Sequence, residues 1–216
     1  MSVTLLSVTT PLDKCLTAED FIVYTARVSN PASQAAMENN ERLLKYLIEN
    51  NHWSPFEMVN ACIEIKTTRD IARQILRHRS FSFQEFSQRY ARVESPINYR
   101  EARMQDKTNR QNSIELPTTV KSAITDKWTT IQENVFTHAV SAYEQALDQG
   151  IAKEVARALL PEGLTGSTLY MNGTLRSWIH YCQLRMGNGT QKEHKEIAKQ
   201  CFEELSVMFP ITMSLI

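Results

Sequence analysis

The sequence predicts an α+β fold, a helix-rich single domain of residues 1–216 with a small antiparallel sheet. Apolar residues recur at helical period along most of the chain, whereas only two stretches alternate as strands do. No βαβ alternation and no internal repeat is present. A chain of 216 residues is also long enough to bury a substantial core in one domain.

The N-terminal third contains both predicted strands. Val3–Val8 is typical of a short strand, and Met58–Thr67 alternates and is rich in β-branched residues. Between them we expect a helix over Ala18–Val28 with Thr17 as its N-cap, then a second helix that ends ahead of Pro55. The apolar stripe of this second helix consists of Leu43, Leu44, Leu47 and Ile48.

The rest of the chain is predicted to be helical, apart from the irregular stretches around its motifs and one long polar surface loop, Tyr99–Thr118. Glycine or proline follows most of these helices and ends them. The expected helices are Arg69–Arg79, Thr119–Gln149 before Gly150, Ala152–Leu160 before Pro161, Thr174–Met186 before Gly187, and Gln191–Met208 ahead of Pro210.

Composition restricts the possible functions. Lys and Arg together number 24, as do Asp and Glu, so the zero net charge disfavours a general nucleic-acid binder. No apolar run approaches the roughly 18–20 residues of a membrane span. The first ten residues also lack the pattern of a signal peptide, so we expect a cytoplasmic protein.

The cysteines and two of the histidines are expected to have no chemical role. The cysteines lack CxxC spacing, which argues against a zinc site and against a disulfide framework. None has a neighbouring histidine or basic turn that would favour a thiolate nucleophile. We expect His138 and His194 on the surfaces of long helices, without partners. The four cysteines are Cys15, Cys62, Cys182 and Cys201.

The most cationic stretch, ILRHRSFSFQEFSQRY, predicts an anion-binding site. Arg77, Arg79 and Arg89 keep their charge, and the single Glu85 cannot compensate all three. Phenylalanines interleave with these arginines and prefer burial, which a partly buried pocket for a polyanion would satisfy. Because the chain has no Gly-rich phosphate loop, side chains would have to hold the phosphate.

The same stretch resembles the signature of flavin-dependent thymidylate synthases, RHRxxSxNExSxR. The chain departs from it only at Gln84, where the family usually has asparagine, and we assign no role to that longer side chain. The matching positions are Arg77, His78, Arg79, Ser82, Glu85, Ser87 and Arg89.

Three further segments are similar to elements of the same family, so the likeness covers most of the chain. His52–Ser54 resembles its H-x-S segment, and Glu154–Arg157 with the following Leu160-Pro161 resembles its E-x-x-R…LP element. Arg176–Arg185 resembles its C-terminal RSxxH…LR helix.

The resemblance implies an enzyme that methylates dUMP at C5 to give dTMP. The one-carbon unit would come from 5,10-methylenetetrahydrofolate, and the electrons from NADPH through bound FAD. A homotetramer is also implied, with active sites where subunits meet. Arginines that are unpaired within one chain would then meet phosphate groups at an interface.

The resemblance also implies two sets of site residues and no metal site. Many relatives have asparagine at the position of Thr174, so this flavin contact departs from the family pattern. dUMP would be held by Gln74, Arg77, Glu85, Ser87, Arg89, Arg157 and Arg185. FAD would be bordered by Ser54, Arg77, His78, Arg79, Glu85, Thr174, Arg176 and His180.

Arg185 is the catalytic residue that the resemblance implies. C5 of uracil is a poor nucleophile, and a fixed guanidinium aimed at the N3–O4 edge would enrich it electrostatically. Thr174, Trp178, Tyr181 and Arg185 share one helical stripe, so a rigid element would hold Arg185. Without the resemblance we would favour a simpler role for Arg185, that of a cation at a helix C-terminus.

Three alternatives stay open at this point. Gln74, Arg77 and His78 could form a solvated helix edge. The departures at Gln84 and Thr174 would suit a nucleotide-binding enzyme of the same fold that has lost redox chemistry. The arginine and phenylalanine stretch could bind single-stranded nucleic acid by stacking, although the zero net charge counts against it.

Overall fold

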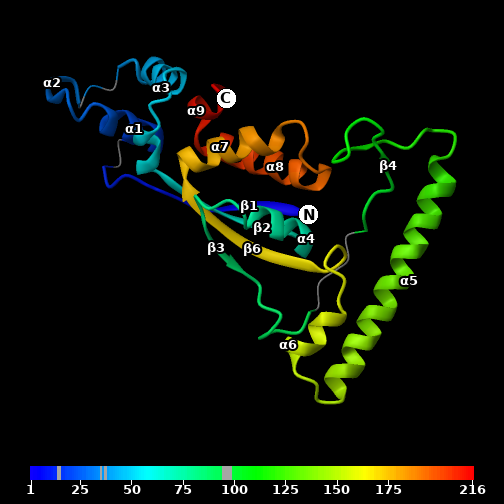
Figure 1. Cartoon of the computed structure of the whole chain (residues 1–216). Helices are drawn as coiled ribbons and strands as arrows, with labels where there is room; N and C mark the ends of the chain where they lie inside the picture. The colour runs from blue at the N-terminus through cyan, green and yellow to red at the C-terminus, as the bar shows by residue number, and fades with distance from the viewer. Residues whose placement is uncertain (14–15, 35, 37, 94–98) are drawn as a thin grey trace.

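A four-stranded antiparallel sheet lies at the centre of the chain, with its strands in the order β1-β2-β6-β3 (Figure 1). The structure is a computed structural model, which describes residues 1–13, 16–34, 36, 38–93 and 99–216. The expected helix-rich α+β class with a small antiparallel sheet is confirmed. The strands are β1 (Ser2–Val8), β2 (Asn60–Thr68), β3 (Ser82–Glu85) and β6 (Gly166–Thr174).

Helices cover one face of this sheet and extend beyond both of its ends (Figure 1). The pair α7 and α8 packs along the sheet, α1, α3 and α9 gather at one end, and the long α5 lies at the other. The helices are α1 (Ala18–Ala26), α2 (Pro31–Gln34), α3 (Asn40–Glu49), α4 (Arg69–Ile75), α5 (Lys121–Asp148), α6 (Lys153–Ala156), α7 (Leu175–Met186), α8 (Lys192–Met208) and α9 (Pro210–Ser214). The short 3-10 helices are η1 (Ser54–Met58) and η2 (Arg157–Leu159).

Local signals in the sequence set several helix ends. The Thr17 hydroxyl accepts a hydrogen bond from the Asp20 backbone N–H at 3.1 Å, and the Asp20 carboxylate accepts one from the Thr17 N–H at 3.0 Å. This reciprocal pair is a capping box, which confirms Thr17 as the N-cap. Gly150 follows α5 with φ +82°, a left-handed conformation that ends a helix at little cost in glycine. Pro210 ends α8 but also begins α9, because proline suits the first position of a helix.

The central strand β6 was missed by the sequence analysis. Its sequence, GSTLYMNGT, contains two glycines and an asparagine, which strands disfavour. It is a strand because β2 pairs along its whole length on one side and β3 pairs on the other. Gly173 is required here, since a Cβ at this position would overlap the ring of Phe81.

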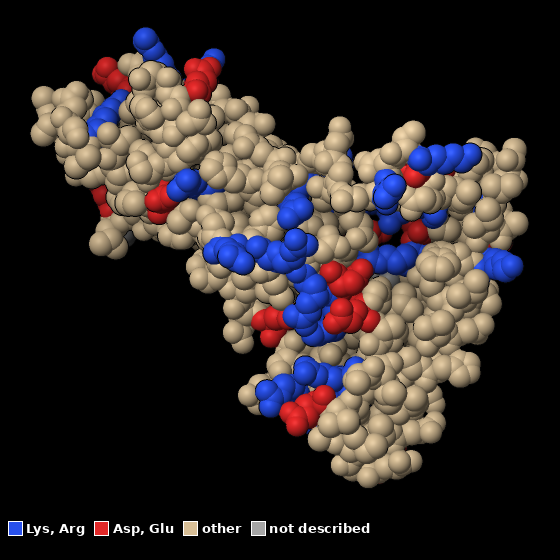
Figure 2. Space-filling view, viewed as in Figure 1, with Lys and Arg blue, Asp and Glu red and all other residues tan. Residues whose placement is uncertain are grey.

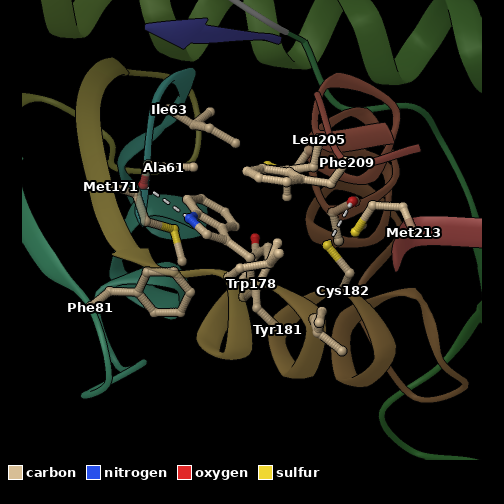
Figure 3. Close-up of a cluster of buried hydrophobic side chains, with 14 of the residues drawn as sticks. Ala61, Ile63, Phe81, Met171, Trp178, Tyr181, Cys182, Leu205, Phe209 and Met213 are labelled. Carbon is tan, nitrogen blue, oxygen red and sulfur yellow. Dashed lines mark hydrogen bonds between the residues drawn. The ribbon is translucent and has the colours of Figure 1, made fainter. Parts of the chain in front are cut away.

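The core lies between this sheet and the pair α7 and α8. Ile63 of β2 faces Met171 of β6 in register, and both are fully buried. Trp178 of α7 is also fully buried, and its indole N–H donates to the Ala61 carbonyl at 3.0 Å (Figure 3). The ring of Phe81 packs edge-on against Trp178, with centroids 4.8 Å apart. This core therefore fixes α7 against the start of β3.

Two other predictions are wrong in ways that matter for function. The helix expected over Arg69–Arg79 ends at Ile75, because the N–H of His78 bonds back to the Ile75 carbonyl in a turn at 3.0 Å. The polar stretch Tyr99–Thr118 is not wholly irregular, since β4 (Met104–Gln105) and β5 (Ser113–Ile114) pair within it. Among the described helices, none combines the length and apolar character that a membrane crossing needs.

Candidate functional site

The turn after α4 places His78 against Arg185 near the end of α7. The Arg185 Nε–H donates to His78 Nε2 at 2.8 Å, so this ring nitrogen must be unprotonated. Burial lowers the pKa of His78 to about 4, with smaller contributions from the charges of Arg185 and Arg77. His78 is thus a neutral acceptor that holds the guanidinium of Arg185. This contact excludes the solvated helix edge as a description of His78.

The signature segment continues along α7 towards the start of that helix. The Ser177 hydroxyl donates to the Ser80 carbonyl at 3.3 Å. Thr174 caps α7, since its hydroxyl accepts from the Ser177 N–H at 3.2 Å. The segment of His78 to Ser80 therefore follows α7 with the opposite polarity, and both ends of the segment are tied to it.

The start of α7 brings together four of the residues expected to border FAD. His180 packs edge-on against Trp53, with ring centroids 4.6 Å apart, next to Ser54 at the start of η1. Arg176 makes an ion pair with Glu57 of η1. Burial, followed by the charge of Arg176, lowers the pKa of His180. We call His78, Ser80, Thr174, Arg176, Ser177, His180 and Arg185 the α7 group.

Two guanidinium groups beside the α7 group have no counter-charge among the residues that the structure describes. Arg77 and Arg79 are exposed and make no hydrogen bond or ion pair with any residue in the described ranges. In the face drawn in Figure 2, basic side chains gather across the middle, with acidic side chains among them. Since arginine cannot lose its charge, these two positions suit phosphate oxygens of a ligand.

Glu85 belongs to a second cluster, on the edge strand β3. Its carboxylate lies 3.6 Å from Arg69 and 3.3 Å from Arg73, and it accepts a hydrogen bond from Ser167 at 2.9 Å. The sequence analysis named Glu85 as the single acid of the signature stretch but did not predict these ion pairs. It also missed Arg69 and Arg73, although their spacing of four residues with Arg77 marks one side of a helix.

The remaining residues of this cluster come from the turn after β3, from α6 and from the start of η2. Glu154 accepts from Arg89 Nε at 3.2 Å, and its backbone carbonyl accepts from Arg157 Nε at 3.2 Å. The Ser87 hydroxyl accepts from the Arg89 N–H at 3.4 Å. A cavity of about 570 Å³ opens here, and its lining includes Arg69, Arg73, Gln88, Glu154, Arg157 and Glu162. We call Arg69, Arg73, Glu85, Arg89, Glu154 and Arg157 the Glu85 group.

The two groups are separate within one chain. In the part of the chain that the structure describes, no hydrogen bond or ion pair joins a member of the α7 group to a member of the Glu85 group. The expected dUMP ligands are divided between them, with Arg185 in one and Arg89 and Arg157 in the other.

Gln74 makes its side-chain hydrogen bonds with Gln191 and His194, at the start of α8, and not with a described member of either group. Its side chain donates to the Gln191 side chain at 2.8 Å and lies 3.4 Å from the ring of His194. His194 was expected on the surface without a partner, but it is fully buried and has two. It faces inward because α8 packs on α7 and α4. His138 is exposed as expected, yet its ring contacts the Asn134 carbonyl at 2.7 Å.

The described cysteines have the properties of core residues. Cys62, Cys182 and Cys201 are free thiols. Burial raises the pKa of each, and that of Cys182 to about 12. Such thiols are not poised as thiolates, which agrees with the expectation for these three. Cys15 lies outside the described residues. Across the ranges that are described, no cluster of His, Cys, Asp and Glu could hold a metal ion.

The buried histidines predict a loss of stability in acid. Burial, with nearby positive charge, lowers the pKa of His194 to about 3 and that of His78 to about 4, from an ordinary 6.5. The unfolded chain therefore binds protons that the folded chain excludes, so stability is complete above pH 6.5 and falls as pH drops towards 4 and 3. At pH 5, His194 alone should reduce the free energy of unfolding by about 2 kcal/mol.

Urea unfolding between pH 8 and pH 5 measures this loss. His194→Asn, which cannot titrate, should show a smaller decrease than the unaltered chain. An identical decrease in both proteins would contradict the assignment of a neutral, buried His194.

Comparison with known proteins gives consistent similarities. A family model described as thymidylate synthase complementing protein matches residues 12–211. A "Probable flavin-dependent thymidylate synthase" of Paramecium bursaria Chlorella virus 1 is 49% identical over 97% of this chain and 96% of its own length. A "Flavin-dependent thymidylate synthase" of Synechocystis sp. is 50% identical over 85% of this chain and 82% of its own length.

A solved structure has the same fold. The crystal structure of the UMP/dUMP methylase PolB from Streptomyces cacaoi, bound with 5-Br dUMP, aligns with a TM-score of 0.83. The alignment covers 99% of this chain and 93% of that chain at 24% sequence identity.

Proposed function

Because this chain belongs to the family of flavin-dependent thymidylate synthases, a class of methyltransferases, we propose that it methylates dUMP at C5 to give dTMP. The one-carbon donor is 5,10-methylenetetrahydrofolate, and NADPH is the source of electrons. The observation that carries this proposal is the Arg185–His78 contact of 2.8 Å, which joins the signature segment to the C-terminal motif. Residues 1–216 act as one domain, and the free thiols suit the reducing cytoplasm.

The residues at the α7 group fit FAD. Arg77 and Arg79 are exposed guanidinium groups that lack a counter-charge among the described residues, and a diphosphate supplies one. Ser54, Thr174, Arg176 and His180 would border the same cofactor beside η1. When bound, FAD supplies the hydride that it has received from NADPH.

The Glu85 group fits the phosphate of dUMP. Its cavity of about 570 Å³ has more guanidinium than carboxylate groups in its lining, so it favours an anion. Arg89 pairs with the Glu154 carboxylate, whereas Arg157 donates only to the backbone carbonyl of Glu154, so a phosphate would supply the negative charge that faces Arg157. Glu85 itself lies within ion-pair distance of Arg69 and Arg73, and its carboxylate can accept from a ribose hydroxyl.

We propose a homotetramer whose active sites form where subunits meet. The lack of a direct bond between the two groups in the described part of one chain supports this proposal, because one dUMP could contact Arg185 and the Glu85 group on neighbouring subunits. The phosphate would then bind to the Glu85 group of one subunit, and the uracil would face Arg185 of another.

Arg185 would activate the uracil by charge alone. The guanidinium stabilises negative charge on the N3–O4 edge, and electron density at C5 rises. C5 would then form a bond to the methylene carbon of the folate, and the C5 proton would leave. The bond between that carbon and the folate nitrogen would break, which releases tetrahydrofolate, and a hydride would complete the methyl group. His78 accepts from Arg185 Nε, which leaves the terminal nitrogens of Arg185 to face the nucleotide.

A variant that lacks all four cysteines should retain dTMP formation within about threefold of the original rate. The reason is that no step requires a thiol, and the described thiols have raised pKa values. Chromatographic assay of dTMP measures the rate, and circular dichroism checks the fold. If a single Cys→Ala change in a folded protein stopped the reaction, a covalent thiol mechanism would replace the electrostatic one.

The visible absorbance of the purified protein tests the cofactor. We expect one FAD per chain and formation of dTMP only when both methylenetetrahydrofolate and NADPH are present. A flavin-bound protein that binds dUMP but makes no dTMP would favour an enzyme of this fold without the redox reaction. A colourless protein that does not take up added FAD would contradict the proposal.

A further inference from the structure

We propose that His194 and Gln191 are positioning residues, which fix the side-chain amide of Gln74 in the orientation that the uracil nucleotide requires. The proposal rests on the proposed function for the identity of the nucleotide. The inference goes beyond the proposed function because it assigns a role to two residues at the start of α8 that the family signature does not contain. A chain of four hydrogen bonds between α7, α4 and α8 carries it.

The chain of hydrogen bonds begins at the carboxylate of Glu193. Gln191 donates its side-chain N–H to Glu193 at 2.9 Å, and a carboxylate can only accept. The amide oxygen of Gln191 therefore faces Gln74 and accepts from Gln74 Nε2 at 2.8 Å. This bond in turn directs the amide oxygen of Gln74 towards His194.

The last bonds follow from the orientation of Gln74. An amide oxygen only accepts, so the His194 Nδ1, 3.4 Å away, must carry the proton. The other ring nitrogen of a neutral imidazole is an acceptor, and it lies 3.2 Å from the hydroxyl of Tyr181. Tyr181 must therefore donate. Every polar group from Tyr181 to Glu193 has one assigned direction.

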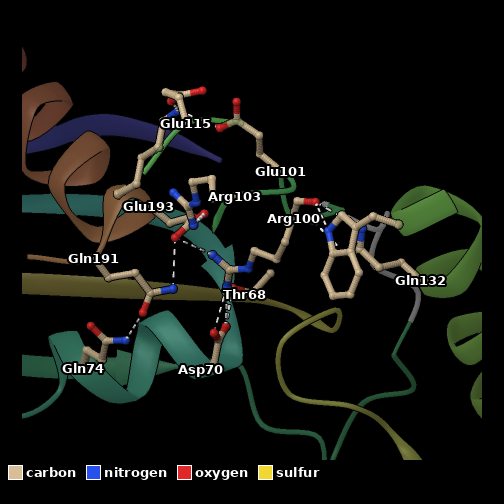
Figure 4. Close-up of polar contacts among 12 residues, drawn as sticks. Thr68, Asp70, Gln74, Arg100, Glu101, Arg103, Glu115, Gln132, Gln191 and Glu193 are labelled. Atoms are coloured by element: carbon tan, nitrogen blue, oxygen red, sulfur yellow. Dashed lines mark hydrogen bonds and ion pairs between the residues drawn. The ribbon is translucent and has the colours of Figure 1, made fainter. Parts of the chain in front are cut away.

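Glu193 anchors one end of the chain of hydrogen bonds, because two arginines hold its carboxylate (Figure 4). Its carboxylate lies 3.2 Å from Arg100 and 2.6 Å from Arg103. Burial alone would raise the pKa of Glu193, but hydrogen bonds and these two arginines lower it overall, so it stays ionised. Arg100 is fixed in turn by Asp70 of α4 at 2.6 Å. The anchor thus joins α4, α8 and the segment after Tyr99.

This arrangement leaves Gln74 with a defined face for a ligand. One N–H bonds to Gln191 and one side of the oxygen bonds to His194, so a second N–H and a second lone pair remain. Reversal of the amide would place N–H against N–H and oxygen against oxygen, and both bonds would be lost. The chain of hydrogen bonds also lies close to His78, which holds Arg185. The ring centroid of His78 is 4.9 Å from that of Tyr181 and 6.2 Å from that of His194.

Two substitutions at one position separate positioning from packing. In His194→Asn, the side-chain amide can replace Nδ1 and still donate to Gln74. In His194→Gln, the longer side chain reaches the place of Nε2, keeps Tyr181 and loses Gln74. Both remove a buried ring, so both should lower the urea midpoint by similar amounts. His138→Asn and His138→Gln on the exposed side of α5 are the matched controls.

Calorimetric titration of dUMP into the FAD-loaded proteins measures how each substitution changes the dissociation constant for dUMP. We expect His194→Asn to keep the dissociation constant within about threefold and His194→Gln to raise it at least tenfold, which is about 1.4 kcal/mol. Equal dissociation constants for the two variants would overturn the positioning role. If the unaltered protein failed to bind dUMP, the proposed function would fail instead.

A second measurement does not depend on any ligand. Solid-state NMR of protein labelled with ¹⁵N-histidine reports which ring nitrogen carries the proton, and His194→Asn identifies the signal among five histidines. We expect a neutral ring protonated at Nδ1. Protonation at Nε2 would reverse donor and acceptor in the bonds of His194 to Gln74 and Tyr181, and it would overturn the inference.

Discussion

Arg185→Ala should lower dTMP formation about 100- to 1,000-fold while FAD remains bound, because this is the cost of removing one preorganised charge-stabilising donor in comparable sites. His78 cannot replace it, since His78 is neutral and accepts from Arg185. Arg176, the other guanidinium of the α7 group, lies at the opposite end of α7 in an ion pair with Glu57. The rate loss should appear in kcat, as the stabilised charge develops only during the reaction.

Single-turnover formation of dTMP measures the effect, with flavin absorbance as the check on the cofactor. Arg185→Lys should recover part of the rate, because the charge is kept while the bond from Nε to His78 is lost. Arg42→Ala on the exposed side of α3 is the control for removal of a surface arginine. Normal turnover in Arg185→Ala would remove this residue from the mechanism.

Glu193→Ala should give the largest loss of stability of any single polar substitution proposed for this chain, about 3–5 kcal/mol in the free energy of unfolding. The Glu193 side chain is 8% exposed and lies between Arg100 and Arg103, which are 15% and 11% exposed. Removal of the carboxylate leaves the mostly buried Arg103 without its ion pair, while Arg100 keeps, among the described residues, only its ion pair with Asp70. It also frees Gln191 at the anchored end of the hydrogen-bond chain.

Urea unfolding at one fixed protein concentration measures this loss, since the stability of an oligomer depends on concentration. Glu115→Ala is the matched control. Glu115 pairs with Lys192 at 2.9 Å, but the two side chains are 60% and 50% exposed. Such a pair contributes less than about 1 kcal/mol. Similar losses for the two variants would mean that Glu193 is not a structural anchor.

The sequence was sufficient to predict the helices whose apolar residues repeat regularly and whose ends carry clear signals. α5 and α8 were placed within about two residues of their observed ends, because their apolar positions repeat and glycine or proline follows them. β6 carries neither signal. It becomes a strand only because β2 and β3 offer hydrogen bonds on both sides, and those partners lie far away in sequence.

The sequence likewise predicted only some residues of the candidate site. Residues within the signature were found because the spacing of their side chains is recognisable in the sequence. The ion pairs of Glu85 with Arg69 and Arg73 were not predicted, since they depend on how β3 and α4 are placed in the fold. His194 and Gln191 were not found, because only the packing of α8 on α4 and α7 brings them to Gln74.

Release of tritium from dUMP labelled at C5 tests the central proposal most directly, because the C5 hydrogen must leave before a methyl group can take its place. The unaltered protein should release tritium in proportion to dTMP formed, only with bound FAD, NADPH and methylenetetrahydrofolate, and the cysteine-free variant should do the same. A flavin-loaded protein that released no tritium with all three present would contradict the assignment of this chain as a dUMP methylase.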